Sequence, residues 1–445
     1  MPELSHPVVF TTTTPYPLPS QKFMIPASWK RYQLSQLVNK SLSLLKPVPF
    51  EFLVRGEILR TTLGEWCSEK GIGEEETLEI EYFESVMPPQ KMSSLPHEEW
   101  VSAVTCQVPG YFLTAAYDGQ IRVFDYSQKL VQTIPIHDAP ATSLTVVGQA
   151  STDSDSFLIA SASHDLTARI TRTTLAEDGS GKPSAQTLAS LHLHTAPIAS
   201  IASTSSGSHL LTASWDNLIG VWDTIIPAAD EVPVEDGPER KKRRKNADDN
   251  ASKPKRKAPL SVLKSHTARV SKAIFAPASN SRAYSAGFDS TVRTWDVENA
   301  VCTDTITASS KPFLDIAVSH SGDFVLAASS DRTVTQYDVR SPTSSTSTAA
   351  LSTATFLHPA TPSCIALSPA SSSTNSQQFI TGAYDGVVRL WDARSARTAV
   401  TSFKVWEGQS HGRKVLSVDW AGGVAAVGGE GGVDVWKIGS AQVQN

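Results

Sequence analysis

The chain has 445 residues, of which 40% are hydrophobic and 19% charged, and a formal net charge of −5, as in an ordinary globular protein. No apolar run reaches the ~20 residues that a membrane-spanning helix needs, and the N-terminus lacks the basic start and apolar core of a secretory signal. The four cysteines form no Cys-x-x-Cys pair, which argues against a zinc site or a disulfide scaffold.

The N-terminal part of the chain has a mixed helix and strand pattern. Apolar residues alternate over residues 50–54, which predicts a strand, and recur at helical spacing within residues 31–45. A threonine start and a terminal glycine predict a short helix within residues 61–71. The order strand, strand, helix, strand, strand, short helix, strand predicts a ubiquitin-like (β-grasp) domain over residues 6–86. The proline-marked segment 87–96 is predicted to be a linker.

The rest of the chain repeats one unit, which is clearest at residues 381–392, Thr-Gly-Ala-Tyr-Asp-Gly-Val-Val-Arg-Leu-Trp-Asp. This unit predicts a strand, an Asp-Gly turn and a second strand. A repeat of about 40–45 residues is the period of WD-repeat propellers, which have four strands per blade. The chain is therefore predicted to be mainly β, with a seven-bladed WD-repeat β-propeller over residues 97–440 and a basic insertion at 224–259. The turn acids are Asp118, Asp165, Asp216, Asp289, Asp331, Asp385 and Glu430.

Three of the repeats resemble the hydrogen-bonded tetrad of WD propellers, in which His links an Asp to a Ser or Thr and a Trp donates its indole N–H. Because these sets recur from blade to blade, we interpret them as structural and not as catalytic triads, and we predict neither an enzyme nor a cofactor. Blades two, five and seven depart from the pattern and are expected to be looser. The predicted tetrads are His194, Thr212, Asp216 and Trp222; His266, Ser285, Asp289 and Trp295; and His358, Thr381, Asp385 and Trp391.

The basic insertion contains two clusters of Lys and Arg separated by a polar spacer, a pattern typical of nuclear import signals. Its composition predicts that it stays unfolded and exposed. A merely solvated charge run is the simpler alternative, and contact with RNA phosphates is a compatible second role. The cationic residues are Lys241, Lys242, Arg243, Arg244, Lys245, Lys253, Lys255, Arg256 and Lys257.

Two further sets of residues are candidates for binding partners. Three adjacent carboxylates, Glu74, Glu75 and Glu76, precede the last strand of the β-grasp domain, although such a run is usually only solvated charge. Aromatic residues immediately precede four of the turn acids, and aromatic anchors suit interfaces, although burial against neighbouring blades is an equal alternative. These aromatic residues are Tyr117, Trp215, Phe288 and Tyr384.

The layout of a ubiquitin-like domain, a seven-bladed propeller and a basic insertion resembles the ribosome-biogenesis WD-repeat protein family of the pescadillo complex. The segments at 46–50, 56–61, 258–261 and 265–267 carry this resemblance. The notchless-type family shares this domain order, but a resemblance to that family would imply an eight-bladed propeller, whereas this sequence has seven repeats.

The resemblance implies a non-catalytic assembly factor for the large ribosomal subunit and for pre-rRNA maturation, found in the nucleus, nucleolus and nucleoplasm. It implies that the propeller binds the block-of-proliferation WD-repeat protein and pescadillo, and that the AAA ATPase midasin grips the ubiquitin-like domain. Glu75 would then complete the coordination of a Mg²⁺ ion held by midasin, with Glu74 and Glu76 as alternatives. A substrate adaptor for ubiquitin ligation and a direct RNA-binding protein remain the other candidates.

Overall fold

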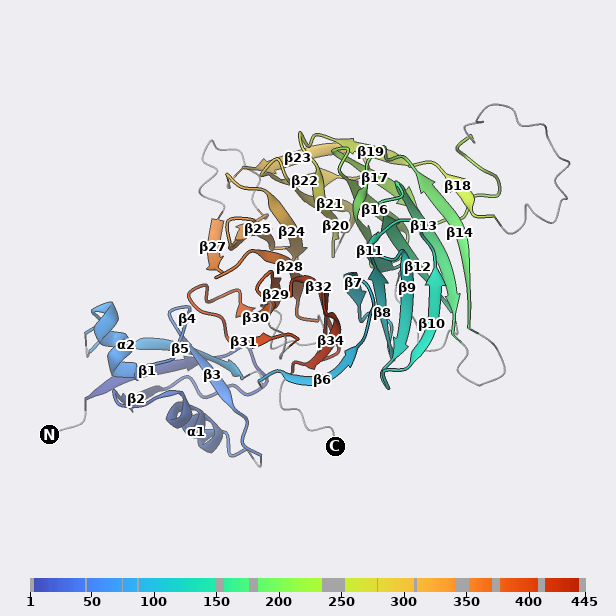
Figure 1. The fold of residues 1–445 in the computed structure, drawn as a ribbon. Coiled ribbons are helices and arrows are strands. Elements are labelled where there is room, and N and C mark those ends of the chain that lie inside the picture. The colour runs from blue at the N-terminus through green and yellow to red at the C-terminus, as the bar shows by residue number, and fades with distance from the viewer. Residues whose placement is uncertain are drawn as a thin grey trace, which may run out of the picture.

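The computed structural model describes residues 4–44, 46–73, 75–85, 88–148, 156–175, 183–233, 253–277, 279–307, 310–340, 352–369, 377–406 and 413–439. A small mixed domain at the N-terminus lies beside a ring of β-sheets (Figure 1). Among the described residues, neither helix has the length and apolar character required to cross a membrane.

The N-terminal domain has the predicted order of elements. Its sheet has the strand order β2-β1-β5-β3-β4, and β1 and β5 run parallel at its centre, which is the β-grasp arrangement. The elements are β1 (Ser5–Thr11), β2 (Lys22–Pro26), α1 (Arg31–Ser41), β3 (Phe50–Val54), β4 (Glu57–Ile58), α2 (Leu63–Lys70) and β5 (Leu78–Glu84).

One hydrophobic core holds this domain together. Leu34 and Val38 of α1 and Trp66 of α2 are buried against the strands, where Phe52 and Tyr82 belong to the same cluster. Helix α2 begins and ends at strong signals: the Thr62 hydroxyl accepts the Glu65 N–H at 3.2 Å, and Gly71 ends the helix in the left-handed conformation. The local sequence therefore specifies both the helix and its limits.

Seven sheets follow within the described residues, and together they form the predicted propeller. Blade one contains β7 (Val101–Thr105), β8 (Tyr111–Ala116), β9 (Gln120–Asp125) and β10 (Leu130–Pro135), and blade two contains β11 (Ala141–Val146), β12 (Ser156–Ser163), β13 (Thr167–Thr174), β14 (Ser184–His192) and the added β18 (Lys255–Lys257). Blade three contains β15 (Ile198–Ser203), β16 (His209–Ser214), β17 (Leu218–Asp223) and β19 (Ser261–Lys264). Blade four contains β20 (Val270–Ala276), β21 (Ser279–Gly287), β22 (Val292–Asp296) and β23 (Val301–Ile306).

Blades five to seven complete the ring. The first strands of successive blades contact one another from β7 through β11, β15, β20, β24, β28 and β32 back to β7. Blade five contains β24 (Phe313–Val318), β25 (Phe324–Ser329), β26 (Thr333–Asp338) and β27 (Ser352–Leu357). Blade six contains β28 (Pro362–Leu367), β29 (Gln378–Ala383), β30 (Val387–Asp392) and β31 (Thr401–Lys404). Blade seven contains β32 (Val415–Ala421), β33 (Val424–Gly429) and β34 (Gly432–Lys437), and β6 (Gln90–Leu95) joins it as the fourth strand.

The prediction that residues 87–96 are only a linker was wrong. Residues Gln90–Leu95 form β6, which pairs antiparallel with β34 as the outer strand of blade seven. The buried carboxylate of Asp434 fixes this pairing, because it accepts the Ser94 hydroxyl at 2.5 Å and forms an ion pair with Lys91 at 2.8 Å. The strand just after the β-grasp domain therefore closes the propeller.

The hairpin that defines the repeat forms as the sequence predicts. In blade six, β29 and β30 pair antiparallel around the turn at Asp385 and Gly386. Gly386 has a φ of +74°, and a Cβ atom there would lie 2.8 Å from the Arg413 carbonyl oxygen, so glycine is required on both counts. The carboxylate of Asp385 accepts the Val387 N–H at 3.0 Å, which closes the turn.

Candidate partner-binding surfaces

Among the described carboxylates of the acidic turn between α2 and β5, Glu75 is the one without a partner. Glu75 is exposed, and the contacts within the described residues give it neither a hydrogen bond nor an ion pair. Glu76 is instead paired with Arg55 of the β3–β4 turn, and Glu74 lies outside the described residues. An unpaired carboxylate on a short turn can reach a cation that another molecule presents.

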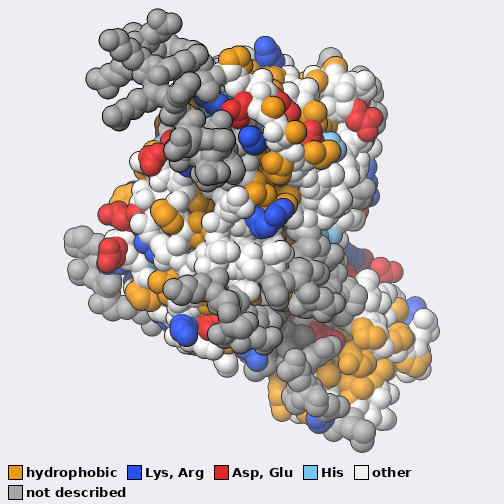
Figure 2. Space-filling model, turned by 90° about the vertical axis from the view of Figure 1, so that its right-hand side faces the viewer, with side chains coloured by type: hydrophobic (Ala, Val, Ile, Leu, Met, Phe, Trp, Pro, Cys, Tyr) orange, Lys and Arg blue, Asp and Glu red, His pale blue; other side chains and the backbone are white. Residues whose placement is uncertain are grey.

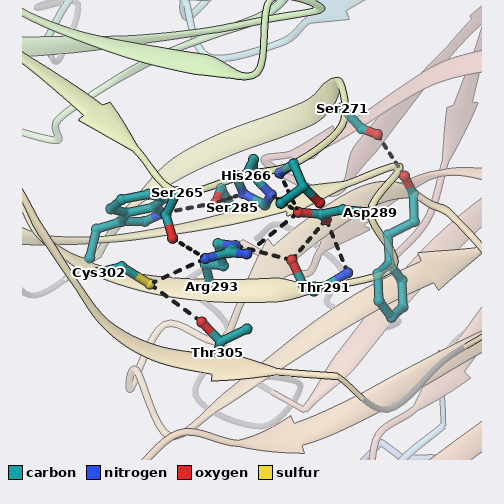
Figure 3. Close-up of polar contacts among 12 residues, drawn as sticks. Ser265, His266, Ser271, Ser285, Asp289, Thr291, Arg293, Cys302 and Thr305 are labelled. Carbon is teal, nitrogen blue, oxygen red and sulfur yellow. Dashed lines mark hydrogen bonds and ion pairs between the residues drawn. The ribbon is translucent and has the colours of Figure 1, made fainter.

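Blades three and four have the complete predicted tetrad. In blade four, His266 lies 2.8 Å from Asp289 through Nδ1 and 2.6 Å from Ser285 through Nε2, and the Trp295 indole N–H donates to the Ser285 oxygen at 2.8 Å (Figure 3). Because the carboxylate can only accept, the histidine donates from Nδ1 and its Nε2 accepts the serine hydroxyl. Every member is thus satisfied in a buried site, which indicates a structural role.

The equivalent contacts in blade three have similar lengths. His194 lies 3.0 Å from Asp216 and 2.8 Å from Thr212, and the Trp222 indole N–H donates to Thr212 at 2.9 Å. Burial raises the pKa of Asp216, but hydrogen bonds, first from His194, outweigh that effect and lower it. The ionised carboxylate is therefore part of the folded blade.

The predicted tetrad of blade six is incomplete. His358 binds Thr381 at 2.9 Å, and Trp391 donates to the same hydroxyl at 3.1 Å, but His358 Nδ1 faces the Phe356 carbonyl at 3.1 Å instead of Asp385. The carboxylate of Asp385 is paired with Arg389, four residues later, at 2.6 Å. A guanidinium within reach of the carboxylate thus replaces the histidine, while the ring keeps the same tautomer.

Blade one repeats the arrangement of blade six, which the repeat pattern did not predict. His97 contacts the Leu95 carbonyl at 3.0 Å and the Thr114 hydroxyl at 2.9 Å. Asp118 is paired with Arg122 at 2.5 Å. An arginine four residues after the turn acid does not by itself identify this variant, because Arg169 and Arg293 stand at the same spacing from Asp165 and Asp289, which keep their histidine partners.

Blade two has three of the four tetrad members. His137 links Asp165 and Ser161, both at 2.8 Å, although Thr171 stands where the tryptophan is expected. Burial raises the pKa of Asp165, but hydrogen bonds from His137 and Thr167 outweigh that effect and lower it to about 2. The contacts of His137 with Asp165 and Ser161 therefore form even though the tryptophan is absent.

Two of the predicted aromatic residues lie in one continuous cluster. The Arg269 guanidinium stacks 3.5 Å from the centre of the Phe288 ring and 5.3 Å from that of Trp215. The ring centres of His164 and Trp215 are also 5.3 Å apart. These four residues, which we call the aromatic stripe, extend across blades two to four, and Trp215 is 41% exposed.

The other two aromatic candidates lie apart from the aromatic stripe. Tyr117 is half-buried beside Trp100, with ring centres 5.8 Å apart. Tyr384 is 41% exposed, and the Lys414 ammonium lies 5.6 Å from its ring centre. Burial raises the pKa of both tyrosines.

The prediction that the basic insertion stays unfolded and exposed was wrong for its second cluster. Strand β18 pairs parallel with the edge strand β14 of blade two. Lys257 is 3% exposed and paired with Asp223, while the Arg256 N–H donates to Asp230 at 2.9 Å and its guanidinium donates to the Pro233 carbonyl at 2.8 Å. The unpaired backbone of an edge strand and nearby acids thus fold this segment. Lys253 is exposed, and residues 241–245 lie outside the described residues.

No extended basic surface is visible on the face shown in Figure 2. Among the described residues there, Lys and Arg side chains alternate with Asp and Glu side chains over the propeller. Sequence-independent contact with nucleic acid needs many cations aligned on one face. The described part of this face offers no such alignment.

The fold and its tetrads define a WD-repeat propeller protein with an N-terminal β-grasp domain. Two family models match the chain: the NLE (NUC135) domain over residues 7–67, and the WD domain, G-beta repeat, over 90–125, 185–223, 257–296, 300–338 and 352–392. The first three strands of blade two, which lacks the tryptophan, lie outside the matched WD segments.

Curated relatives extend over nearly the whole chain. It is 58% identical to the ribosome biogenesis protein YTM1 of Laccaria bicolor, with 99% of this chain and 96% of that protein covered. Identity to the YTM1 protein of Coprinopsis cinerea is 56%, with 97% and 94% covered. For the YTM1 protein of Saccharomyces cerevisiae (strain S288c), identity is 33%, with 89% and 88% covered. The chain therefore belongs to the YTM1 family of ribosome biogenesis proteins.

Proposed function

We propose that this protein is a non-catalytic assembly factor for the large ribosomal subunit and for pre-rRNA maturation. Its propeller is a docking platform, and its β-grasp domain is a handle by which the AAA ATPase midasin removes it. Membership in a ribosome biogenesis family supports the general role. The exposed, unpaired carboxylate of Glu75 is the observation that carries the proposal of a handle.

The handle works through a metal ion that the partner holds. Mg²⁺ prefers oxygen ligands in octahedral geometry, and an ion with one open position accepts a carboxylate from another molecule. Glu75 fits this requirement because it is exposed and has no ion pair with any described residue, whereas Glu76 is already bound to Arg55. The metal supplies the link, and this chain supplies one anionic oxygen on a short turn.

Replacing Glu75 tests the handle directly. Glu75→Ala should abolish Mg²⁺-dependent capture of the full chain by the midasin adhesion domain, while the thermal midpoint and pescadillo-complex binding stay unchanged. Glu79→Ala is the matched control, because Glu79 is an exposed carboxylate on β5. If Glu75→Ala were captured as well as the unmodified chain, the assignment of Glu75 would be refuted.

The propeller is proposed to bind the block-of-proliferation WD-repeat protein and, with it, pescadillo. The aromatic stripe supports this role, since exposed aromatic and arginine side chains dominate the binding energy of interfaces. Trp215→Ala should weaken the complex at least 10-fold in a pull-down titration. Tyr126→Ala is the control, because Tyr126 is 56% exposed and lies outside the stripe. Equal losses from both variants would exclude the stripe as the docking site.

The location in the nucleus, nucleolus and nucleoplasm is proposed to depend on residues 241–245. The same insertion is also proposed to contact RNA.

The competing function, a substrate adaptor for ubiquitin ligation, predicts a different behaviour on a sedimentation gradient. Co-migration of the tagged chain with large-subunit precursors supports the assembly role, and its absence from them would favour the adaptor. A notchless-type identity is disfavoured, because seven blades are present among the described residues.

A further inference from the structure

The outer face of the β-grasp sheet, on the side away from α1, packs against blade six. Leu53, Ile58 and Phe83 form a separate hydrophobic cluster there, with exposed fractions of 1%, 7% and 0%, and the propeller residue Val400 packs against it. Figure 1 shows β4 and β5 beside the blade that contains β30 and β31. The small domain is therefore docked on the propeller as well as joined to it through β6.

Arg394 is the centre of this contact. Its guanidinium binds Asp392 of blade six through two nitrogens, at 2.9 and 2.7 Å, and Glu81 of β5 at 2.6 Å. It also stacks 4.6 Å from the centre of the Phe83 ring. Asp392 is fully buried, so it fixes the arginine in position to receive the other domain.

Three weaker contacts surround this centre. The Arg60 guanidinium donates to the Val400 carbonyl at 3.0 Å, and Arg397 is paired with Glu57 at 3.2 Å. The Ile58 N–H donates to the Ser395 hydroxyl at 3.4 Å. All of them link the β3–β4 hairpin and the segment after it to the loop between β30 and β31.

The same hairpin also supports the acidic turn. Arg55, at its tip, is paired with Glu76, next to Glu75. Gly56, the following residue, lies against the Arg394 backbone, because a Cβ atom there would be 3.5 Å from its carbonyl oxygen. A single hairpin therefore joins the acidic turn to blade six.

We infer that this set of contacts, centred on Arg394, is a latch that holds the acidic turn in one orientation relative to the propeller. The latch also gives blade six a share of any force applied to the small domain, which otherwise reaches the propeller only through β6. The source of that force rests on the proposed function, but the latch itself does not.

Hydrogen exchange on the full chain without any partner tests the latch. Glu81→Lys should bring a second cation against Arg394 and speed exchange of the Ile58 amide at least 10-fold. Glu79→Lys is the control, because Glu79 lies on the same face of β5, two residues away, and is exposed. Exchange in the β1–β5 pair should stay slow in both variants, which shows that the small domain remains folded.

A change on the propeller side gives an independent measurement. Arg394→Ala should produce the same faster exchange at Ile58, whereas Arg340→Ala should not, since Arg340 is 64% exposed and is paired with Asp338 of blade five, outside the latch. Unchanged exchange at Ile58 in both Glu81→Lys and Arg394→Ala would overturn the latch. Failure of midasin capture in Glu75→Ala concerns only the proposed function, so the two failures are distinguishable.

Discussion

Replacing the tetrad acid should cost far more stability in blade four than in blade six. The Asp289 carboxylate is 3% exposed and accepts four hydrogen bonds: from His266 and the Thr267 N–H on one oxygen, and from the N–H and hydroxyl of Thr291 on the other. In Asp289→Asn, the amide keeps one acceptor oxygen, so one of these pairs faces an NH₂ group. Two hydrogen bonds to a charged group are then lost, at about 1.5–3 kcal/mol each.

The same change in blade six removes much less. Asp385 is 26% exposed, and an asparagine oxygen can still accept the Val387 N–H. Only the ion pair with Arg389 is lost, and a partly exposed pair contributes about 0.2–1 kcal/mol. The two variants should therefore differ by about 3 kcal/mol, which corresponds to a factor of about 100 in the local opening constant.

Native-state hydrogen exchange is the suitable assay, because a two-domain chain of this size does not unfold in a single two-state step. Peptides from β21 and β22 in Asp289→Asn are compared with peptides from β29 and β30 in Asp385→Asn. The protection factors of the β21 and β22 peptides in Asp289→Asn should fall about 100-fold more than those of the β29 and β30 peptides in Asp385→Asn. Equal losses in the two blades would refute the argument that His358 and Asp385 are unlinked.

The remaining predictions concern pH and nuclear import. Burial and the neighbouring Arg389 hold the pKa of His358 at about 4, below its unfolded value of ~6.5. Neutral His358 therefore stabilises the fold fully above pH ~6.5, and up to about 3 kcal/mol of this stability is lost as the pH falls towards 4. Over the same pH range, the thermal midpoint should fall less steeply for His358→Gln than for the unmodified chain. Glutamines at 241–245 should exclude a fluorescent fusion from the nucleus, whereas Lys257→Gln should leave import unchanged and lower the thermal midpoint.

The fold was predictable because its signals are local. Alternation, turn glycines and helix caps all act within a few residues, as at Thr62 and Gly71 for α2 and at Gly386 for the blade-six turn. The complete tetrads were found for a similar reason, since each repeats the same residue types at similar spacing. Sequence periodicity therefore specified the elements, the order of the small domain and the ring of blades.

The missed features depend on partners that lie far away in the chain. Strand β6 has a weak pattern, and its partner β34 is more than 300 residues away. The role of Asp385 depended on whether a histidine or Arg389 would reach it, and both residues were present in the sequence. Lys257 belongs to a cluster whose composition predicts exposure, but in the fold its strand pairs with the edge strand β14 and its ammonium group is paired with Asp223. In each case a tertiary contact, and not a local preference, decided the outcome.

The position of β6 gives the latch its mechanical meaning. Strand β5 ends at Glu84 and β6 begins at Gln90, so a pull on the small domain reaches the outer strand of blade seven almost directly. That strand is held by one antiparallel pairing and by Asp434, and a strand pulled from its end can lose its hydrogen bonds one after another. Contacts around Arg394 connect the same domain to a different blade, where the load falls on the partly exposed ion pair between Arg394 and Glu81 and on an apolar cluster. If the small domain is the proposed handle, its attachment at two blades would let an applied force act on blade six as well as on the closing strand of blade seven.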